Sequence, residues 1–131
     1  YFLELVRQGR LTAQESNGEK LTFHDSCYLG RWNGIYQAPR DLLSWINGGA
    51  KPIEMVRSES KGFCCGAGGA RMFMEETIGK RIYLERTEEI VRQDVANVAV
   101  GCPFCATGEL GLWRDLRTSE IIAAISSIRM S

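Results

Sequence analysis

Residues 97–105 read NVAVGCPFC and contain the feature around which the rest of the chain is organised. The run from Asn97 to Gly101 is short and apolar, as expected for a strand that is buried on both faces of a sheet. The C-x-x-C that follows, Cys102 to Cys105, lies where this strand turns into a helix. Such a turn places two sulfur atoms on one side, near enough to share a metal or to form a disulfide. The stretch therefore predicts a buried strand followed by a pair of thiols.

Two earlier segments repeat this order of strand and cysteine. Leu21–Asp25 has the β-branched and aromatic content of a short strand, and it runs into Cys27. Pro52–Val56 is a second expected strand, and a polar loop leads from it to Cys64 and Cys65. All five cysteines of the chain thus follow the ends of predicted strands.

Helices are predicted between and after these strands. Pro39 can open a helix at its first turn, and an apolar stripe continues from it until Asn47 and two glycines stop it. A long helix is expected over about 70–94, because apolar side chains recur there near helical spacing. Two further helices are predicted, one from the C-x-x-C to about Leu116 and one over 119–128.

The alternation of strand and helix predicts an α/β fold with a Rossmann-like parallel sheet and crossover helices. In open sheets of this kind the ligand crevice lies outside the carboxyl ends of the strands, so three separate loops can bring their thiols to one place. Residues 1–131 are expected to form a single domain. Within it, 1–19 supply a leading helix, through about Leu11, and a loop, and 20–131 form the core.

Composition and charge limit which partners the chain is expected to bind and in which cellular compartment it is expected to work. Sixteen Lys and Arg residues balance sixteen Asp and Glu residues, so no overall field draws the domain to nucleic acid. The charge-rich stretch 85–89 is predicted to be a solvated helix face. No apolar run is long enough to cross a bilayer. The odd count of five cysteines, two of them adjacent, fits a secreted disulfide framework poorly and favours a reducing, cytoplasmic setting.

The cysteine spacing favours an iron-sulfur cluster. Thirty-six residues separate Cys27 from Cys64, and thirty-six separate Cys65 from Cys102. A bond between the adjacent cysteines would close a strained ring, whereas neighbouring thiolates can bind different irons of one cluster. Three alternatives stay open: a structural zinc site that uses four of the five thiols, a thiol-disulfide centre at Cys102 and Cys105, and a set of small buried hydrophobic residues.

Three motifs carry a resemblance to a known family: HDSCYLGR at 24–31, CCGAGG at 64–69 and GCPFC at 101–105. Together they resemble the cysteine-rich CCG domain found in heterodisulfide reductase and in the iron-sulfur subunits of glycolate and lactate oxidation. The resemblance runs from about Leu21 to Leu112. Within that family the chain is similar to the iron-sulfur oxidoreductases that pass electrons between electron-transfer flavoprotein and a quinone.

This resemblance implies a function and a ligand set. In the best understood members of the family the motif holds a noncubane four-iron cluster, which here would be a 4Fe-4S cluster bound by Cys27, Cys64, Cys65, Cys102 and Cys105. The chain would be the electron-transfer module, and the C-terminal fragment, of a larger oxidoreductase, without a complete activity of its own. A ferredoxin-like domain and a flavoprotein or quinone-linked partner would complete that protein and bring the module to the inner face of the membrane. The alternative is a zinc-binding structural or docking module of a redox complex.

Residues beside the cysteines are expected to tune such a centre. Gly66, Gly68 and Gly69 bend the backbone into the following helix and direct amide N–H groups at the cluster sulfurs, although a tight turn needs them equally. His24 is expected to donate a hydrogen bond to a ligand or to be a satisfied core histidine, and direct metal binding is the less favoured alternative. Arg31 is expected to offset the negative charge of the thiolates, unless it is simply solvated.

Overall fold

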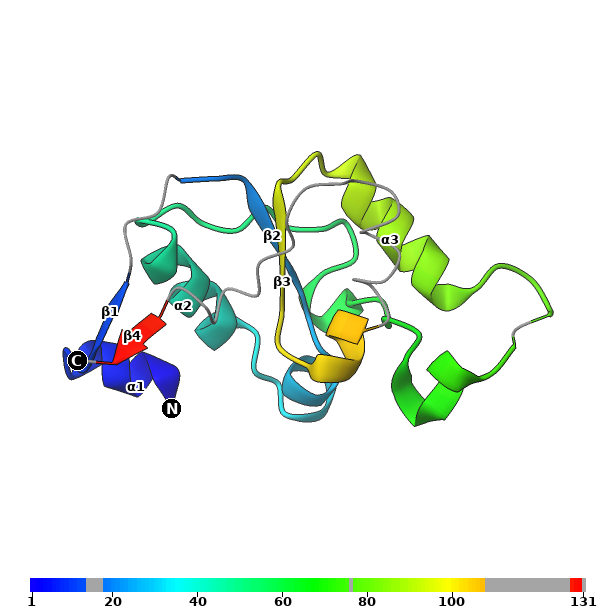
Figure 1. Cartoon of the computed structure of the whole chain (residues 1–131), viewed down its shortest axis with the longest axis horizontal. Helices are drawn as coiled ribbons and strands as arrows, with labels where there is room; N and C mark the ends of the chain where they lie inside the picture. The colour runs from blue at the N-terminus through cyan, green and yellow to red at the C-terminus, as the bar shows by residue number, and fades with distance from the viewer. Residues whose placement is uncertain (14–17, 76, 108–127, 131) are drawn as a thin grey trace.

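The computed structural model describes residues 1–13, 18–75, 77–107 and 128–130 (Figure 1). They contain both helices and strands, including a small parallel sheet, which is compatible with the predicted α/β class. The α-helices are α1 (Phe2–Arg7), α2 (Gln37–Ile46) and α3 (Ile82–Arg92), and the strands are β1 (Leu11–Ala13), β2 (Leu21–His24), β3 (Asn97–Val100) and β4 (Ile128–Met130). Shorter segments are a π-helical turn (Tyr28–Trp32), 3-10 turns (Glu59–Lys61 and Gly68–Phe73) and a helical turn over 103–107.

A parallel pair of strands, β2 and β3, lies at the centre of the molecule (Figure 1). Leu21 of β2 is opposite Asn97 of β3, and the pairing continues in register to His24 and Val100. The expected strand 52–56 is reduced to one parallel bridge, in which Ile53 pairs with Thr22. Pro52 has no N–H to give to a ladder, which limits pairing at that point. The described parallel sheet is therefore small, and its Rossmann-like extension stays a prediction.

The helices α2 and α3 cover opposite faces of this strand pair. On one face Leu43 of α2 packs with Phe23 and Ala99. On the other face Ile90 of α3 packs with Val98, in a cluster that also contains Met55 and Val95. Successive strand residues point to opposite faces, so the neighbours Val98 and Ala99 serve the two clusters separately. The apolar run of β3 is buried on both sides, as its sequence predicts.

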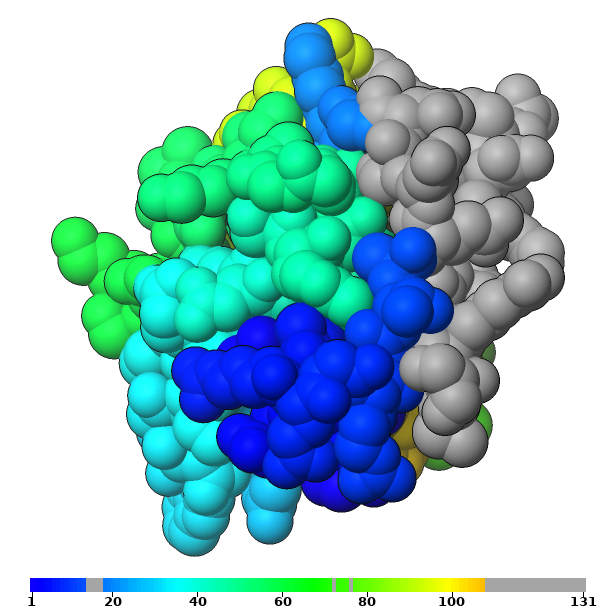
Figure 2. Space-filling view, turned by 90° about the vertical axis from the view of Figure 1, so that its left-hand side faces the viewer, coloured from blue at the N-terminus to red at the C-terminus, as the bar shows by residue number. Residues whose placement is uncertain are grey.

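The N-terminal prediction was partly wrong. The first helix ends at Arg7, because Gly9 takes a positive φ of 67° that a helix does not continue through. Leu11 is instead a buried residue of β1, which pairs antiparallel with β4. Figure 2 shows this blue N-terminal segment against the cyan segment that leads into α2. Residues 103–107 are helical as predicted, and Ile128 begins β4 rather than ending a helix; the rest of the two C-terminal predicted helices lies outside the described residues.

The long helix predicted over about 70–94 was also wrong at its start. Its first residues form the 3-10 turn Gly68–Phe73, and the α-helix begins only at Ile82. Gly69, Ala70 and Gly79 have φ values of 64°, 61° and 71°, and left-handed residues interrupt a right-handed helix. The apolar residue Ile78, which contributed to the helical pattern, is 93% exposed.

The charged stretch 85–89 is only partly a solvated face, because Glu85 and Glu88 are 35% and 44% exposed but the other charged residues are buried. Arg86 is 0% exposed and Glu89 is 5% exposed. The Glu89 carboxylate accepts hydrogen bonds from the backbone N and the Nε of Arg57, both at 2.7 Å, and from Nη1 of Arg86 at 3.0 Å. The charged sequence wrongly predicted solvent exposure for Arg86 and Glu89, because charged residues that pair with one another in the interior have the same sequence pattern as solvated ones.

Candidate metal centre

A small cavity lies beyond the carboxyl ends of β2 and β3. The loop after β2, the loop that carries the adjacent cysteines, and the helical turn after β3 all contribute to it. Segments that are far apart in the sequence thus meet at one cavity, as expected for the carboxyl ends of neighbouring parallel strands. The lining residues are His24, Asp25, Cys27, Arg31, Glu59, Gly62, Phe63, Cys64, Cys65 and Cys105.

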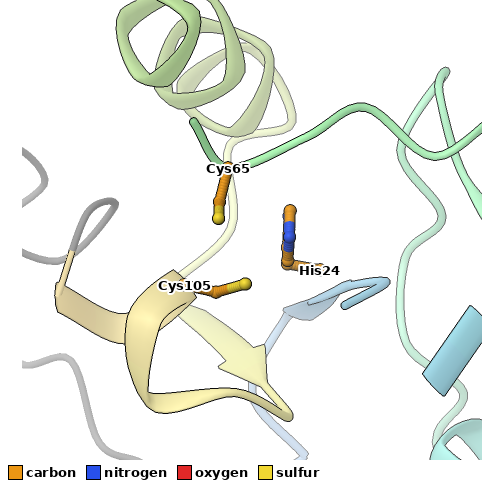
Figure 3. Close-up of side chains that lie close together, drawn as sticks. All are labelled: His24, Cys65 and Cys105. Atoms are coloured by element: carbon orange, nitrogen blue, oxygen red, sulfur yellow. The ribbon is translucent and has the colours of Figure 1, made fainter. Parts of the chain in front are cut away.

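The inner part of the cavity holds one imidazole and two sulfurs. His24, Cys65 and Cys105 are all buried, and their ligand atoms lie within 4.8 Å of one another. Figure 3 shows these three side chains converging from three different segments. Such a set of soft sulfur and nitrogen donors suits zinc or an iron-sulfur cluster. Among the described residues, these three are the group whose ligand atoms lie close enough together to hold one metal ion.

The other three cysteines lie around this inner group. Cys27 is exposed and Cys64 is half-buried, and both line the cavity. Cys102 is half-buried and packs against the cluster of Cys65, Ala67 and Cys105 rather than lining the cavity. The structure therefore brings four of the five cysteines to the cavity wall and places the fifth directly beside it.

The glycines after the adjacent cysteines differ in their roles. Gly66 donates its backbone N–H to Sγ of Cys64 at 3.3 Å. It has a φ of 79°, and a Cβ at this position would lie 2.9 Å from the backbone N of Tyr83, so the close approach to α3 requires a glycine. Gly68 and Gly69 lie in the 3-10 turn, where an added Cβ would meet nothing within 4 Å. Of the three glycines, Gly66 is the one whose amide N–H donates to a sulfur among the hydrogen bonds of the described residues.

The adjacent thiols have opposite electrostatic environments. A hydrogen bond from the Cys105 thiol lowers the pKa of Cys65; burial opposes this effect, and hydrogen bonds from His24 and from the backbone of Ala67 add to it, giving a pKa of about 4. Burial raises the pKa of Cys64. The thiolate is the form that binds metals, so Cys65 is prepared as a ligand.

A buried ion pair fixes the loop that carries Cys27. Arg40 of α2 donates to both carboxylate oxygens of Asp25, each at 2.9 Å, and to both oxygens of Glu54, each at 2.7 Å. The backbone N–H of Glu59 donates to Asp25 at 2.7 Å. Burial raises the pKa of Asp25, but the hydrogen bonds from Arg40 and Glu59 outweigh it and hold the pKa below its usual value. Arg40 was missed in the sequence, because an arginine on a helix carries no signal of a partner fifteen positions away.

Arg31 lies at the cavity, and its guanidinium contacts the opposite loop. Its Nη2 donates to the carbonyl oxygen of Gly62 at 2.9 Å, and the side chain lines the cavity. Arg31 is therefore in place to act on the charge of the thiolates, and that role stays a prediction.

The comparison with protein families decides what this cysteine pattern represents. The model of the cysteine-rich domain family, CCG, matches residues 21–108. The chain belongs to the CCG family of cysteine-rich domains. The resemblance drawn from the three cysteine motifs is thereby confirmed at the level of the family.

Several curated proteins are similar to this CCG chain. A probable iron-sulfur-binding oxidoreductase FadF of Bacillus subtilis is 48% identical over 104 residues, which are 79% of this chain and 15% of the relative. An EtfAB:quinone oxidoreductase of Syntrophomonas wolfei is 40% identical over 111 residues, again 79% and 15%. One subunit of the dihydromethanophenazine:CoB–CoM heterodisulfide reductase of Methanosarcina mazei is 33% identical over 130 residues, 96% and 32%.

The chain thus spans between 15% and 32% of the length of these relatives. No solved structure matches it. Among the described residues, none of the helices has the length and apolar character that crossing a membrane requires.

Proposed function

We propose that this chain is an electron-transfer module of a larger oxidoreductase and that it binds a 4Fe-4S cluster at the cavity beyond β2 and β3. The observation that carries the proposal is the gathering of thiols from three distant segments in and beside one cavity. A bound cluster would accept and release single electrons there. The names of the relatives, which include an iron-sulfur-binding oxidoreductase and a quinone oxidoreductase, support this direction.

The residues present fit such a group. We assign Cys27, Cys64, Cys65, Cys102 and Cys105 as its ligands. Five thiolates are one more than a cubane cluster would bind at one thiolate per iron, which favours a noncubane cluster. The backbone donor at Gly66 and the lowered pKa of Cys65 both favour thiolates at this place. Ser26 adds a buried hydroxyl without a hydrogen-bond partner among the described residues, so a spare donor lies next to Cys27 in sequence.

The larger protein is part of the same proposal. Residues 1–131 form a single CCG-type domain with a Rossmann-like core and belong to the C-terminal portion of a longer chain. Its partners are a ferredoxin-like domain and a flavoprotein or quinone-linked protein, and it works in the cytoplasm at the inner face of the membrane. The short share of each relative that the chain covers supports the existence of further modules.

A structural zinc site is the second candidate. The observation that favours it is the group of His24, Cys65 and Cys105, which are buried and within 4.8 Å of one another. One more thiol would complete the tetrahedral set that zinc prefers. Zinc would then leave thiols without a metal, whereas the iron-sulfur assignment uses all five.

Metal analysis separates the two candidates. Protein prepared anaerobically and reconstituted with iron and sulfide is expected to hold about four irons per chain and to absorb broadly in the visible range. A preparation that takes up only stoichiometric, colourless zinc under the same conditions would contradict the proposal.

A further inference from the structure

Arg86 reaches from α3 to the histidine of the metal centre. It is 0% exposed, and its Nε donates a hydrogen bond to Nδ1 of His24 at 3.1 Å. A guanidinium has only donors and stays charged in proteins. Nδ1 of His24 must therefore be the acceptor in this bond. A neutral imidazole has a single N–H, so the proton is on Nε2.

The imidazole ring of His24 also lies beside two sulfurs. The ligand atoms of His24, Cys65 and Cys105 lie within 4.8 Å of one another, and Figure 3 shows the ring beside both sulfurs. The side chain of His24 is also a hydrogen-bond partner of Cys65. Because Nδ1 is occupied by Arg86, the donor in this bond is Nε2–H.

Arg86 is itself fixed by other groups. Its Nη1 donates to the carbonyl oxygen of Arg57 at 2.9 Å and to Glu89 at 3.0 Å. Its Nη2 is buried and has no hydrogen-bond partner among the described residues. A guanidinium held in this way cannot turn aside to let the imidazole change its tautomer.

We propose that Arg86 is a positioning residue of the metal centre: it locks His24 in the Nε2–H tautomer, so that His24 donates a hydrogen bond to the Cys65 sulfur and does not bind metal. A metal-binding histidine usually donates its other ring N–H to a carboxylate or a carbonyl oxygen. In His24 the second nitrogen, Nδ1, faces the guanidinium of Arg86, which cannot accept a hydrogen bond. Metal binding through Nε2 would force a proton onto Nδ1, against the N–H of Arg86.

The tautomer follows from the chain alone, and its effect on a cluster rests on the proposed function. An N–H donor at a cluster sulfur and a buried positive charge behind it both stabilise the reduced, more negative state. The pair of Arg86 and His24 therefore raises the reduction potential of the cluster. In the zinc alternative the same pair removes His24 from the ligand set.

The first experiment reads the tautomer directly. His24 is the only histidine of the chain, so labelling histidine with ¹⁵N gives one pair of ring signals. The protein as purified, whether it holds iron, zinc or no metal, is expected to carry the proton on Nε2, with an unprotonated Nδ1 that accepts the hydrogen bond from Arg86. A proton on Nδ1, or an Nε2 bound to metal, overturns the proposal. This reading needs no variant and does not depend on which metal the protein holds.

The second experiment measures the effect on the cluster. In iron-reconstituted protein, Arg86→Gln is expected to lower the ratio of reduced to oxidised cluster about tenfold at a fixed potential, equivalent to about 59 mV for one electron. Arg92→Gln is the matched control, because it removes an exposed positive charge from the same helix. It is expected to leave the potential unchanged. Equal shifts in the two variants, or a strong nitrogen coupling in pulsed electron paramagnetic resonance of wild type, overturn the role of Arg86; failure to take up iron contradicts the proposed function instead.

Discussion

Replacing Arg40 with methionine is expected to destabilise the fold, because it leaves a buried carboxylate without its counter-charge. Arg40 and Asp25 are among the most enclosed charged side chains beside the centre, with side chains that are 7% and 3% exposed. Without Arg40, the Asp25 carboxylate keeps the hydrogen bond from the backbone of Glu59 as its described partner. Breaking one side of a buried pair costs about 3–5 kcal/mol.

The magnitude comes from the Asp25 contact and not from the second carboxylate. Glu54 is 45% exposed, so its pair with Arg40 is screened by water and contributes about 0–1 kcal/mol. The expected loss for Arg40→Met is therefore about 3–5 kcal/mol of unfolding free energy. Adding Asp25→Asn removes the stranded charge, and the double variant is expected to lose less than the sum of the two single losses.

Urea unfolding of wild type, both single variants and the double variant measures this coupling. Arg92→Gln serves as the control for loss of an exposed arginine, with an expected change within about 0.5 kcal/mol. A loss below about 1 kcal/mol for Arg40→Met, or single losses that simply add, would refute the reasoning. The loop that carries Cys27 would then be held by other contacts.

Two further predictions concern pH and the loop of adjacent cysteines. Burial raises the pKa of Glu89, but hydrogen bonds and charge from Arg57 and Arg86 lower it below its usual 4.5, so its contribution to stability is present above that value and is lost as pH falls through the folded pKa. Urea midpoints should therefore drop as the pH falls below about 5. Glu89→Gln should flatten this dependence more than Glu88→Gln, whose side chain is 44% exposed, and equal slopes would contradict the prediction. Gly66→Ala should lower the free energy of unfolding by about 1–3 kcal/mol and reduce the metal content, because the alanine strains a positive φ and crowds Tyr83. Gly68→Ala is the control, since its added methyl group meets open space. Similar metal content in both variants would count against the assigned role of Gly66.

The sequence predicted the centre of the fold well, because that part rests on local patterns. The β-branched and apolar runs of β2 and β3 identified both strands to within one residue. Pro39 and Asn47 located α2 between them. The start of α3 was missed because Ala70 takes a left-handed φ that its residue type does not announce. The pairing of β1 with β4 was missed because strands of three residues depend on contacts more than a hundred positions apart.

The residues of the candidate site likewise fall into those that local sequence motifs revealed and those that only the tertiary structure reveals. The cysteines, His24 and Arg31 stood out through motif spacing, and the structure gathers them around one cavity apart from Cys102, which packs beside it. Arg86 could not be found, because its contact with His24 joins positions sixty-two residues apart and its helix looked like a solvated face. Buried charge pairing is a tertiary property, and a single sequence carries little signal for it. The ligand set itself stays a prediction.

A series of single Cys→Ser variants tests the central claim that five thiolates hold one cluster. Each variant is reconstituted anaerobically with iron and sulfide, and its iron content and electron paramagnetic resonance spectrum are compared with those of wild type. All five substitutions, including Cys102→Ser outside the cavity wall, are expected to alter iron content or spectrum. One variant with unchanged iron, spectrum and potential would contradict the five-ligand assignment, and a silent change at Cys64 or Cys65 would favour a cubane held by four thiolates.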